Sequence, residues 1–402
     1  NPVPSTKKKG EIMLSIKLAW RNLIGAGLRT WLNVFVLSLS FLVIIWFKGF
    51  LAGWDRQARQ DTINQKIGGG VYRQENYDPY DVFTLVDSHA KLPSAMRSAE
   101  KKDQLTPILI AQATIYPDNR VQTILMKGIK PNQKILDLPT EKLSKETAAV
   151  PAIIGANMAK NNDLKIGEQV TLRWRDANGT FDADEVEIVH IFKTNVPAID
   201  NSQVWIPLSH ARDMLQMPGE ATIAVTAQET GYQGQFQGWK FKDQNYLLQD
   251  INEMIKMKSV GGYIMWLVLL SLAWLAIFDT QVLSIFRRQK EIGTDIALGM
   301  TRGQVIKIFT VEGAMNGVLA AILAAIYGTP LLYLQVKHGF AMPEGSEGMG
   351  MALSEVIYPH YSLGMILITT VITLVSVIIV SYLPTRRISN MKPTDAIRGK
   401  LQ

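Results

Sequence analysis

Four long apolar segments constrain the fold of this chain more strongly than any other feature of its sequence. They cover residues 31–52, 260–286, 313–336 and 362–383. Within them only Lys48 and Asp279 carry a charge. A helix of about 20 residues crosses the roughly 30 Å hydrocarbon layer of a membrane, whereas buried helices of soluble proteins rarely extend this far without a charged face. We therefore predict four transmembrane helices, at residues 31–52, 260–286, 305–336 and 362–383.

Basic residues near the ends of these segments predict how the chain is oriented in the membrane. They precede the first segment, separate the second from the third and follow the fourth. The loop 337–361 instead contains three glutamates and one lysine. Because Lys and Arg concentrate in cytoplasmic loops, we predict that both termini (residues 1–30 and 384–402) and the segment 287–304 are cytoplasmic. Residues 53–259 and the loop 337–361 are then extracytoplasmic.

The insert between the first and second apolar segments has a mixed secondary-structure pattern. Residues 108–129 (ILIAQATIYPDNRVQTILMKGI) and 170–192 (VTLRWRDANGTFDADEVEIVHIF) each resemble two strands joined by a turn. Residues 202–217 (SQVWIPLSHARDMLQM) predict a strand followed by a short helix, and residues 220–228 (EATIAVTAQ) predict another strand. The fold class expected is an α-helical membrane protein with four transmembrane helices and a large extracytoplasmic α+β domain inserted between the first and second.

The ends of this insert and its composition add two expectations. The helical pattern of residues 247–258 leads directly into the second apolar segment, which predicts a rigid connection to the membrane. The chain has no cysteine, so the insert must be held by packing without disulfides.

The N-terminal region is basic and amphipathic. Ile16, Trp20 and Ile24 fall on one helical face of residues 14–28, which predicts either an interfacial helix or a plain cytoplasmic extension of the first span. Met13 is a candidate natural start, and we expect the first apolar segment to be an uncleaved anchor. The net charge of +7 comes largely from the cytoplasmic basic residues, and without an aromatic-interleaved basic patch it does not predict a nucleic-acid partner.

The sequence contains no motif of a catalytic or nucleotide-binding site. The patterns GxxxxGK[ST], GxSxG and HExxH are absent, and the five histidines are scattered without ligand spacing. Met342, Met349 and Met351 could in principle ligate a soft metal, but no His or Cys supports them, so we expect a mobile loop and no metal site. We predict a chain that is not itself an enzyme and binds no cofactor.

Two acids lie at or near membrane depth, Asp279 and Glu312. A carboxylate near the bilayer centre costs about 2.5–3.5 kcal/mol, so such residues usually face a partner or a wet cavity. Asp279 either reaches the cytoplasmic interface near Arg287 or contacts another helix; Glu312, close to Lys307, is expected nearer the interface. We retain Asp279, Glu312 and the adjacent Gly313 as candidate contacts between membrane helices.

The cytoplasmic segment between the second and third apolar segments reads RRQKEIGTDIALGMTRGQ. Ile292, Ile296 and Met300 repeat at i, i+4 and i+8 and predict one apolar face of a short helix. Gly299 suits a left-handed residue after that helix, and Thr301 with Gln304 fits the capping box of a new helix. These residues alone leave open whether the segment is a lever that transmits force or a passive connector.

This segment resembles the signature of the FtsX-like permease domain, the family of MacB, FtsX and the LolC/LolE lipoprotein-releasing permeases. The resemblance rests on the KEIG run, the ALGMT turn and the EG pair at the start of the next span. A proline with two arginines and a P-x-x-A-[IL]-R ending extend it at the C-terminus. The matching C-terminal residues are Pro384, Arg386, Arg387, Pro393, Ala396 and Arg398.

The resemblance implies a transmembrane permease subunit of an ABC transporter of the mechanotransmission kind in a bacterial inner membrane. It implies two copies of a cytoplasmic ATPase, which would hold the ATP and Mg, and a second permease chain, identical or homologous. The ATPase would grip Arg287, Arg288, Lys290, Glu291, Ile292, Gly293, Ala297, Leu298, Gly299, Met300, Thr301 and Arg302.

The branch of the family decides the substrate. The segment TILMKGIKP resembles the lipoprotein-releasing permeases, so release of lipoproteins is the expectation. A MacB-like efflux permease with a periplasmic adaptor and an FtsX-like activator of a cell-wall hydrolase are the alternatives. Where the LolC type has a long hairpin that captures a periplasmic carrier, this chain has only the short turn RDANGTFDAD. We therefore do not expect carrier capture by such a hairpin.

Overall fold

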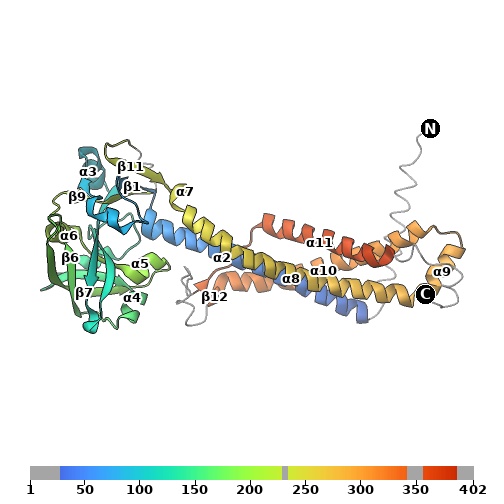
Figure 1. Cartoon of the computed structure of the whole chain (residues 1–402). Coiled ribbons are helices and arrows are strands. Elements are labelled where there is room, and N and C mark those ends of the chain that lie inside the picture. Colours follow the sequence, from blue (N-terminus) through green and yellow to red (C-terminus); the bar gives the residue numbers. More distant parts are fainter. Residues whose placement is uncertain (1–27, 229–233, 342–355, 387–402) are drawn as a thin grey trace. The chain divides into compact units, whose positions relative to one another are not determined.

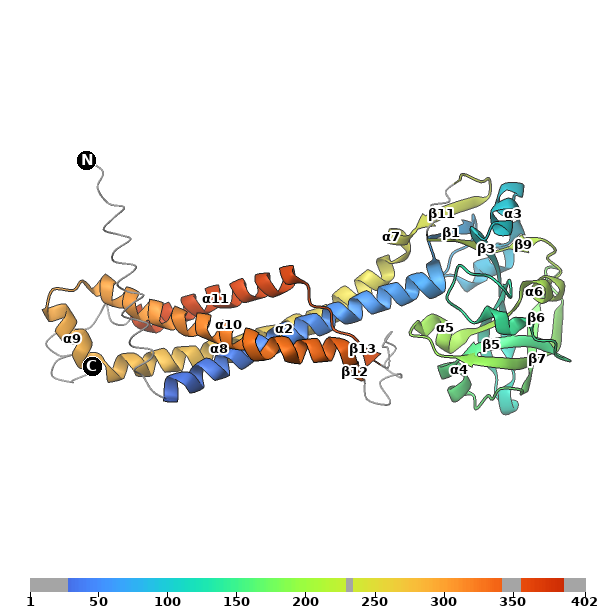
Figure 2. The ribbon, with the colours of Figure 1, turned by 180° about the vertical axis from the view of Figure 1, so that it is seen from behind.

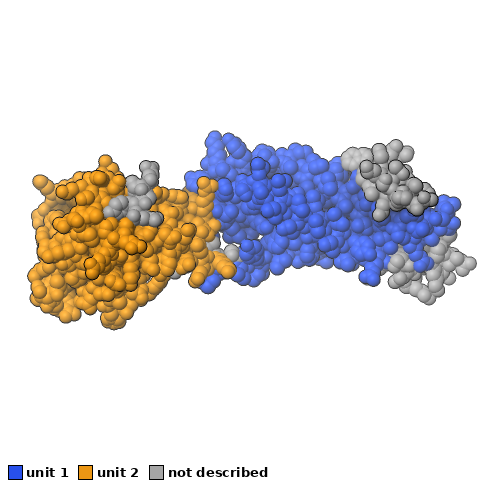
Figure 3. All heavy atoms as spheres, turned by 90° about the horizontal axis from the view of Figure 1, so that it is seen from above, with its two compact units in different colours: residues 1–54, 257–340, 358–402 blue, residues 55–256, 341–357 orange. Residues whose placement is uncertain are grey.

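The computed structural model describes residues 28–228, 234–341 and 356–386, and it divides the chain into two compact units. The helical unit comprises Asn1–Trp54, Met257–Phe340 and Tyr358–Gln402; the mixed unit comprises Asp55–Lys256 and Ala341–Ile357 (Figure 3). The predicted N-terminal helix at residues 14–28, apart from its last residue, and the methionines of the loop 342–355 lie outside the described residues.

The four predicted apolar helices are confirmed. The helical unit is built from α2 (Leu28–Thr62), α8 (Gln249–Arg287), α10 (Arg302–His338) and α11 (Leu363–Thr385), with the short α9 (Gln289–Ala297) between α8 and α10 (Figure 1). Each of the four contains a window long and apolar enough to cross a membrane. The predicted membrane boundaries and the orientation stay predictions.

Helix α2 extends beyond the apolar segment from which it was predicted. Past residue 52 the side chains become polar, but no proline or glycine pair stops the helix, and Arg59 Nε donates to Asp55 Oδ1 at 2.8 Å one turn away. The helix therefore continues to Thr62 and passes into the short π-helix η1 (Ile63–Ile67). The predicted helix at residues 247–258 is likewise present: a break at Leu248 separates α7 (Gln244–Leu247) from the long α8.

The helices of the bundle pack through small residues of α10. Its buried positions include Gly313, Gly317, Ala320 and Ala324, which recur at i, i+4, i+7 and i+11 and form one face. A Cβ at Gly317 would lie 2.9 Å from Cγ1 of Val377 in α11. Such close approach is how membrane helices gain packing energy, because lipid provides no hydrophobic drive between them.

The mixed unit is organised around one nine-stranded sheet of order β11-β1-β10-β3-β4-β8-β5-β7-β6 (Figures 1 and 2). Because β6 also pairs with β3, the six strands from β3 to β6 in this order close on themselves. The strands are β1 (Gly70–Gln74), β3 (Leu105–Ile115), β4 (Gln122–Ile129), β5 (Val150–Gly155), β6 (Gln169–Arg175), β7 (Phe181–Phe192), β8 (Gln203–Pro207), β10 (Ile223–Thr226) and β11 (Trp239–Asp243).

Shorter elements complete the structure. The remaining helices are α3 (Ser94–Lys101), α4 (Ala156–Asn161), α5 (Pro197–Ser202) and α6 (Leu208–Leu215), with 3-10 turns η2 (Val82–Asp87), η3 (Pro117–Asn119) and η4 (Thr140–Ser144). Two short strand pairs are formed by β2 (Ala90–Lys91) with β9 (Glu220–Ala221), and by β12 (Phe340–Ala341) with β13 (Val356–Ile357).

Both predicted hairpins are confirmed. Strands β3 and β4 pair antiparallel across η3, and β6 and β7 pair antiparallel across a tight turn. In that turn Oδ1 of Asp176 accepts hydrogen bonds from the backbone N–H groups of Asn178 and Thr180 at 2.9 and 2.7 Å, and Gly179 takes a φ of +85°. An Asx turn ending in glycine suits this geometry. The predicted strand and helix of residues 202–217 are β8 and α6.

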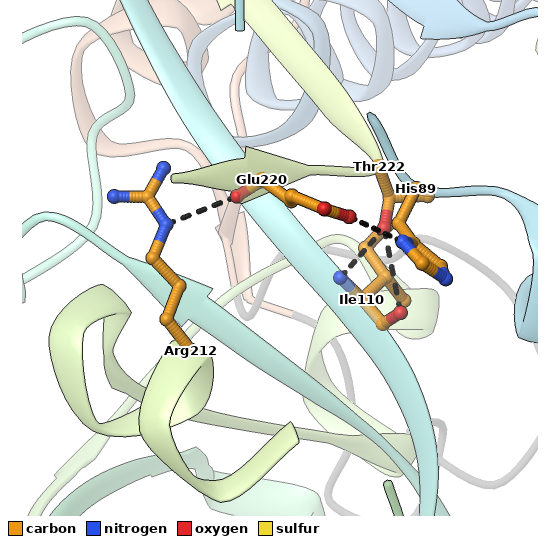
Figure 4. Close-up of polar contacts among 5 residues, drawn as sticks. All are labelled: His89, Ile110, Arg212, Glu220 and Thr222. Carbon is orange, nitrogen blue, oxygen red and sulfur yellow. Dashed lines mark hydrogen bonds and ion pairs between the residues drawn. The ribbon is translucent and has the colours of Figure 1, made fainter. Parts of the chain in front are cut away.

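The predicted strand at residues 220–228 is divided into β9 and β10 by Thr222. The hydroxyl of Thr222 accepts from the backbone N–H of Ile110 at 3.0 Å (Figure 4). On one side of this break the Glu220 carboxylate contacts Nδ1 of His89, and Nε of Arg212 donates to the Glu220 carbonyl oxygen at 3.0 Å. These contacts hold β9 against α6, β3 and the segment that precedes β2.

Two apolar cores lie on opposite faces of the six strands that close on themselves. Along β4, Ile124 and Met126 belong to one of them, here called the first core. Ile129 belongs to the other, called the second core, and Leu125 packs against it. This alternation is expected of a strand buried on both sides. Lys127 takes the position in the second face that an apolar residue would otherwise occupy.

Candidate functional site

The predicted cytoplasmic segment folds into α9 with one apolar face. Ile292 is buried together with Ile285, Val305 and Phe309, while Ile296 and Met300 pack against this cluster. The stripe predicted from the spacing is therefore present, and it attaches α9 to the adjoining ends of α8 and α10. Gly293 is buried on the same helix.

The end of α9 is a Schellman motif followed by a capping box. Gly299 adopts a φ of +102°, its N–H donates to the Ile296 carbonyl at 3.1 Å, and the N–H of Met300 donates to the Asp295 carbonyl at 3.0 Å. Thr301 then caps α10: its hydroxyl accepts from the N–H of Gln304, and the Gln304 side chain accepts from the N–H of Thr301. The two predicted caps are thus both present, and they fix the direction in which the chain leaves α9.

An arginine joins the start of α9 to α10. Nε of Arg288 lies 2.5 Å from Oε2 of Glu291, and its Nη1 lies 2.9 Å from Oε2 of Glu312. The guanidinium also lies over the ring of Phe309, at 4.8 Å from the ring centroid. Burial lowers the pKa of Arg288, but the hydrogen bond that it donates to Glu291 and the charge of Glu312 outweigh the burial, so the net pKa is raised. Arg288 thus links α9 to α10 through two ion pairs, and these contacts are called the Arg288 bracket.

The sequence alone did not pair Arg288 with Glu312, which are 24 positions apart. One signal was available: Phe309 and Glu312 are three residues apart on a helix and share a face, where a largely buried acid requires a cation. The side chain of Glu312 is 14% exposed, in contrast to 64% for Glu291.

The opposite side of the segment is solvent-accessible. Leu298 is 81% exposed, a large apolar side chain that contacts no core. The other exposed residues of this face are Arg287, Lys290, Glu291, Ala297, Thr301 and Arg302. An exposed leucine at a capped corner, on a segment with exposed basic side chains, is the kind of surface that a protein partner recognises.

The candidate contacts inside the membrane helices gather around Gly313. A Cβ at Gly313 would lie 2.4 Å from Oγ of Ser381 and 2.8 Å from Nε2 of Gln281. Asp279 and Asn316 line a neighbouring cavity of about 260 Å³ within the helical unit. Among the described residues, the buried side-chain oxygens of Gln281, Asn316 and Ser381 have no hydrogen-bond partner. Asp279 therefore lies beside a polar cavity, and Glu312 contacts Arg288 instead.

Only part of the candidate C-terminal motif lies in the described chain. Pro384 is buried near the end of α11, and Arg386 caps this helix. Oγ1 of Thr385 lies 3.3 Å from Oγ1 of Thr310, so the end of α11 contacts the first turns of α10. The candidates Arg387, Pro393, Ala396 and Arg398 are outside the described residues.

Comparison with known proteins identifies a family match in the C-terminal third and a relative of most of the chain. Residues 263–393 match the family model described as FtsX-like permease C-terminal. The chain is 22% identical, over 330 residues, to the "Lipoprotein-releasing system transmembrane protein LolC" of Neisseria meningitidis serogroup B (strain ATCC BAA-335 / MC58). That alignment covers 73% of this chain and 77% of the relative.

A solved structure, the extracellular domain of the noncanonic ABC-type transporter YknZ from Gram-positive bacteria, matches 40% of this chain and 83% of its own length at 15% identity. Its TM-score of 0.26 is too low to support an argument about fold. The family match includes α9, the Schellman corner, the capping box and Glu312. Residues 263–393 therefore match the FtsX-like permease domain, and most of the chain is similar to an ABC transporter permease of the LolC kind.

Proposed function

We propose that this chain couples ATP hydrolysis on a separate cytoplasmic ATPase to motion of its mixed unit, and that it thereby extracts or releases lipoproteins from a bacterial inner membrane. The observation that carries the proposal is the corner formed by α9, Gly299 and Thr301. It is braced internally by Arg288, and it presents Leu298 to solvent. A rigid corner with an exposed apolar tip suits the transmission of force better than a passive connector does.

Helix α8 provides the path for that motion. It is continuous from Gln249, in the mixed unit, to Arg287, one residue before the bracket Arg288. A displacement of α9 by the ATPase would act on the end of α8 and be carried along a single helix. ATP and Mg belong to the ATPase in this scheme, two ATPase copies serve two permease chains, and both termini are cytoplasmic.

The substrate class rests on a narrower basis. The relative LolC is named for a lipoprotein-releasing system, and the alignment spans most of both chains. The turn between β6 and β7 is short, so we propose no carrier capture by a hairpin there. A MacB-like efflux permease and an FtsX-like activator of a hydrolase remain the two other candidates, and identification of the co-purifying substrate or partner separates them.

Leu298→Asp tests the proposed ATPase contact. This leucine supports no core, so the charge leaves the fold intact, and we expect loss of the ATPase that co-purifies with the wild-type chain. Ile166→Asp is the matched control, because Ile166 is also exposed (59%) but belongs to the mixed unit. Equal ATPase recovery from wild type and Leu298→Asp would overturn the proposed contact.

A further inference from the structure

The mixed unit contains a cavity whose charges are of one sign. It has a volume of about 200 Å³, and residues of β1, β3, β4, β8 and η1 line it. Its cationic side chains are Lys66, Arg73 and Lys127, and no Asp or Glu of the described residues lines it. Lys66 is exposed and Arg73 is partly buried, so water screens both charges more than it screens Lys127, the one cation buried beside low-dielectric walls.

Lys127 is the most deeply placed of these cations. It is 7% exposed, and its Nζ lies 4.8 Å from the ring centroid of Trp205, its register partner on β8. Within the described part of the chain, the ammonium has neither a hydrogen bond nor an ion pair. A buried ammonium without an anion is costly, and the cation–π contact offsets only part of this cost.

Trp205, which lines the same cavity, also carries an unpaired donor. Its indole Nε1 is buried and has no hydrogen-bond partner among the described residues. An indole N–H can only donate, and so can an ammonium. Both groups therefore require an acceptor, and an oxyanion is the acceptor that would satisfy both.

Most of the remaining lining is apolar. Eight of the residues are aliphatic side chains of the second core and its neighbours, Ile67, Val71, Ile108, Ile110, Ile199, Ile223, Leu247 and Ile251. The volume is below the roughly 300–1,000 Å³ typical of drug-sized pockets, which limits a ligand to a short apolar portion. A free inorganic anion has no apolar part that could contact these aliphatic side chains.

We propose that this cavity binds a small anionic amphiphile, a carboxylate or phosphate group joined to a short apolar chain, with the anion at Lys127 and Trp205 and the chain against the isoleucines. The site is separate from the proposed ATPase contact. It does not depend on which substrate the transporter moves.

Calorimetric titration of the full chain in phosphatidylcholine nanodiscs tests the proposal, with empty nanodiscs subtracted. The probes are octanoate and octyl phosphate, and the comparison ligands are octanol and inorganic phosphate. We expect saturable binding of both probes with one site per chain and no saturable binding of octanol. Equal affinity for inorganic phosphate would reduce the cavity to a plain anion site and overturn the proposed amphiphile. Absence of saturable binding of both probes would overturn the proposal entirely.

Lys127→Met removes the charge and keeps the length of the side chain. We expect at least tenfold weaker binding of octanoate by this variant. Lys134→Met, the same change at an exposed lysine outside the cavity, should bind like wild type. Trp205→Phe keeps a ring but removes the N–H, so it provides a second test if Lys127→Met does not fold. Wild-type affinity in the variant that folds would contradict the assigned site.

Proton uptake gives an independent readout. Burial, with the nearby charge of Lys66, lowers the pKa of Lys127 to about 7. The other titratable groups lining the cavity are Arg73, Tyr77 and Tyr80. An anion beside Lys127 would raise its pKa, so binding at pH 8 should take up a proton and binding at pH 5.5 should not. The same titration in buffers of different ionisation enthalpy measures this uptake, and its absence at pH 8 would overturn the placement of the anion at Lys127.

Discussion

The half-buried Arg288 and the buried Lys127 differ in what surrounds them. Arg288 has two carboxylates and an aromatic face, so its charge has anionic partners. Lys127 has an aromatic face and, among the described residues that line its cavity, no carboxylate. The first arrangement stabilises a junction between helices, whereas the second costs stability and is typical of a site that holds a ligand.

Glu312→Gln should lower the free energy of unfolding of the helical unit by about 1–3 kcal/mol, because Arg288 would lose its shielded charged partner. Glu291→Gln is the matched control, since it removes a carboxylate from the same arginine. Glu291 is largely exposed, so its ion pair is worth less than about 1 kcal/mol. Thermal unfolding in detergent measures both variants, and equal losses would contradict the importance assigned to Glu312.

The pH dependence of stability should carry the signature of Lys127. Its pKa is lowered to about 7 in the folded chain, so between pH 7 and the ordinary lysine pKa the unfolded state binds more protons. Stability then rises with pH across this window, by at most about 1.4 kcal/mol per pH unit. In Lys127→Met this rise should be absent.

Unfolding of wild type and Lys127→Met between pH 6 and pH 10 checks the sign. The variant should be the more stable protein at pH 6, and its advantage should shrink as the pH increases. A constant difference across the whole range would show that Lys127 does not titrate there.

At the scale of elements, the corner after α9 depends on backbone geometry more than on side-chain contacts. Gly299 has a φ of +102°, and a Cβ there would meet nothing within 4 Å. The strain of any substitution at this position therefore comes from the backbone alone. The capping box of Thr301 then begins α10 in a fixed direction, which keeps α9 at a defined angle to α10.

Gly299→Ala should destabilise the corner by about 1–2 kcal/mol, because a residue with a Cβ is strained in the left-handed region. Gly303→Ala is the matched control: it also has open space around its Cβ, but it lies inside the first turn of α10 without a positive φ. There alanine should be neutral or stabilising. Hydrogen exchange of the α9 amides measures both, and faster exchange in Gly303→Ala than in Gly299→Ala would contradict this account of the corner.

Patterns of neighbouring residues in the sequence predicted most of these helices and strands. The same patterns could not predict contacts between residues far apart in the chain. Hydropathy identified the four long helices, and strand-like runs joined by turn residues identified both hairpins. The parallel pairing of β4 with β8 joins residues almost 80 positions apart, such as Lys127 and Trp205, and no local pattern encodes it. The cavity beside Lys127 follows from that pairing, so it was equally hidden.

For the whole molecule, the central claim is that ATP-driven motion enters at α9 and reaches the mixed unit through α8. The corner, its bracket and the unbroken helix are the features on which this claim depends. The chain lacks cysteine, so pairs of spin labels can be placed without removing native thiols. Ile166 in the mixed unit and Tyr333 in α10 are both exposed and provide one label position in each unit.

The most direct test is therefore the distance distribution between labels at Ile166→Cys and Tyr333→Cys, measured by pulsed electron resonance in the complex with the ATPase. We expect the distribution to shift between the nucleotide-free complex and the complex with trapped ATP. In the Leu298→Asp variant, mixed with the ATPase that it is expected not to bind, trapped ATP should cause no shift. Identical distributions in both nucleotide states of a complex that hydrolyses ATP would contradict the account.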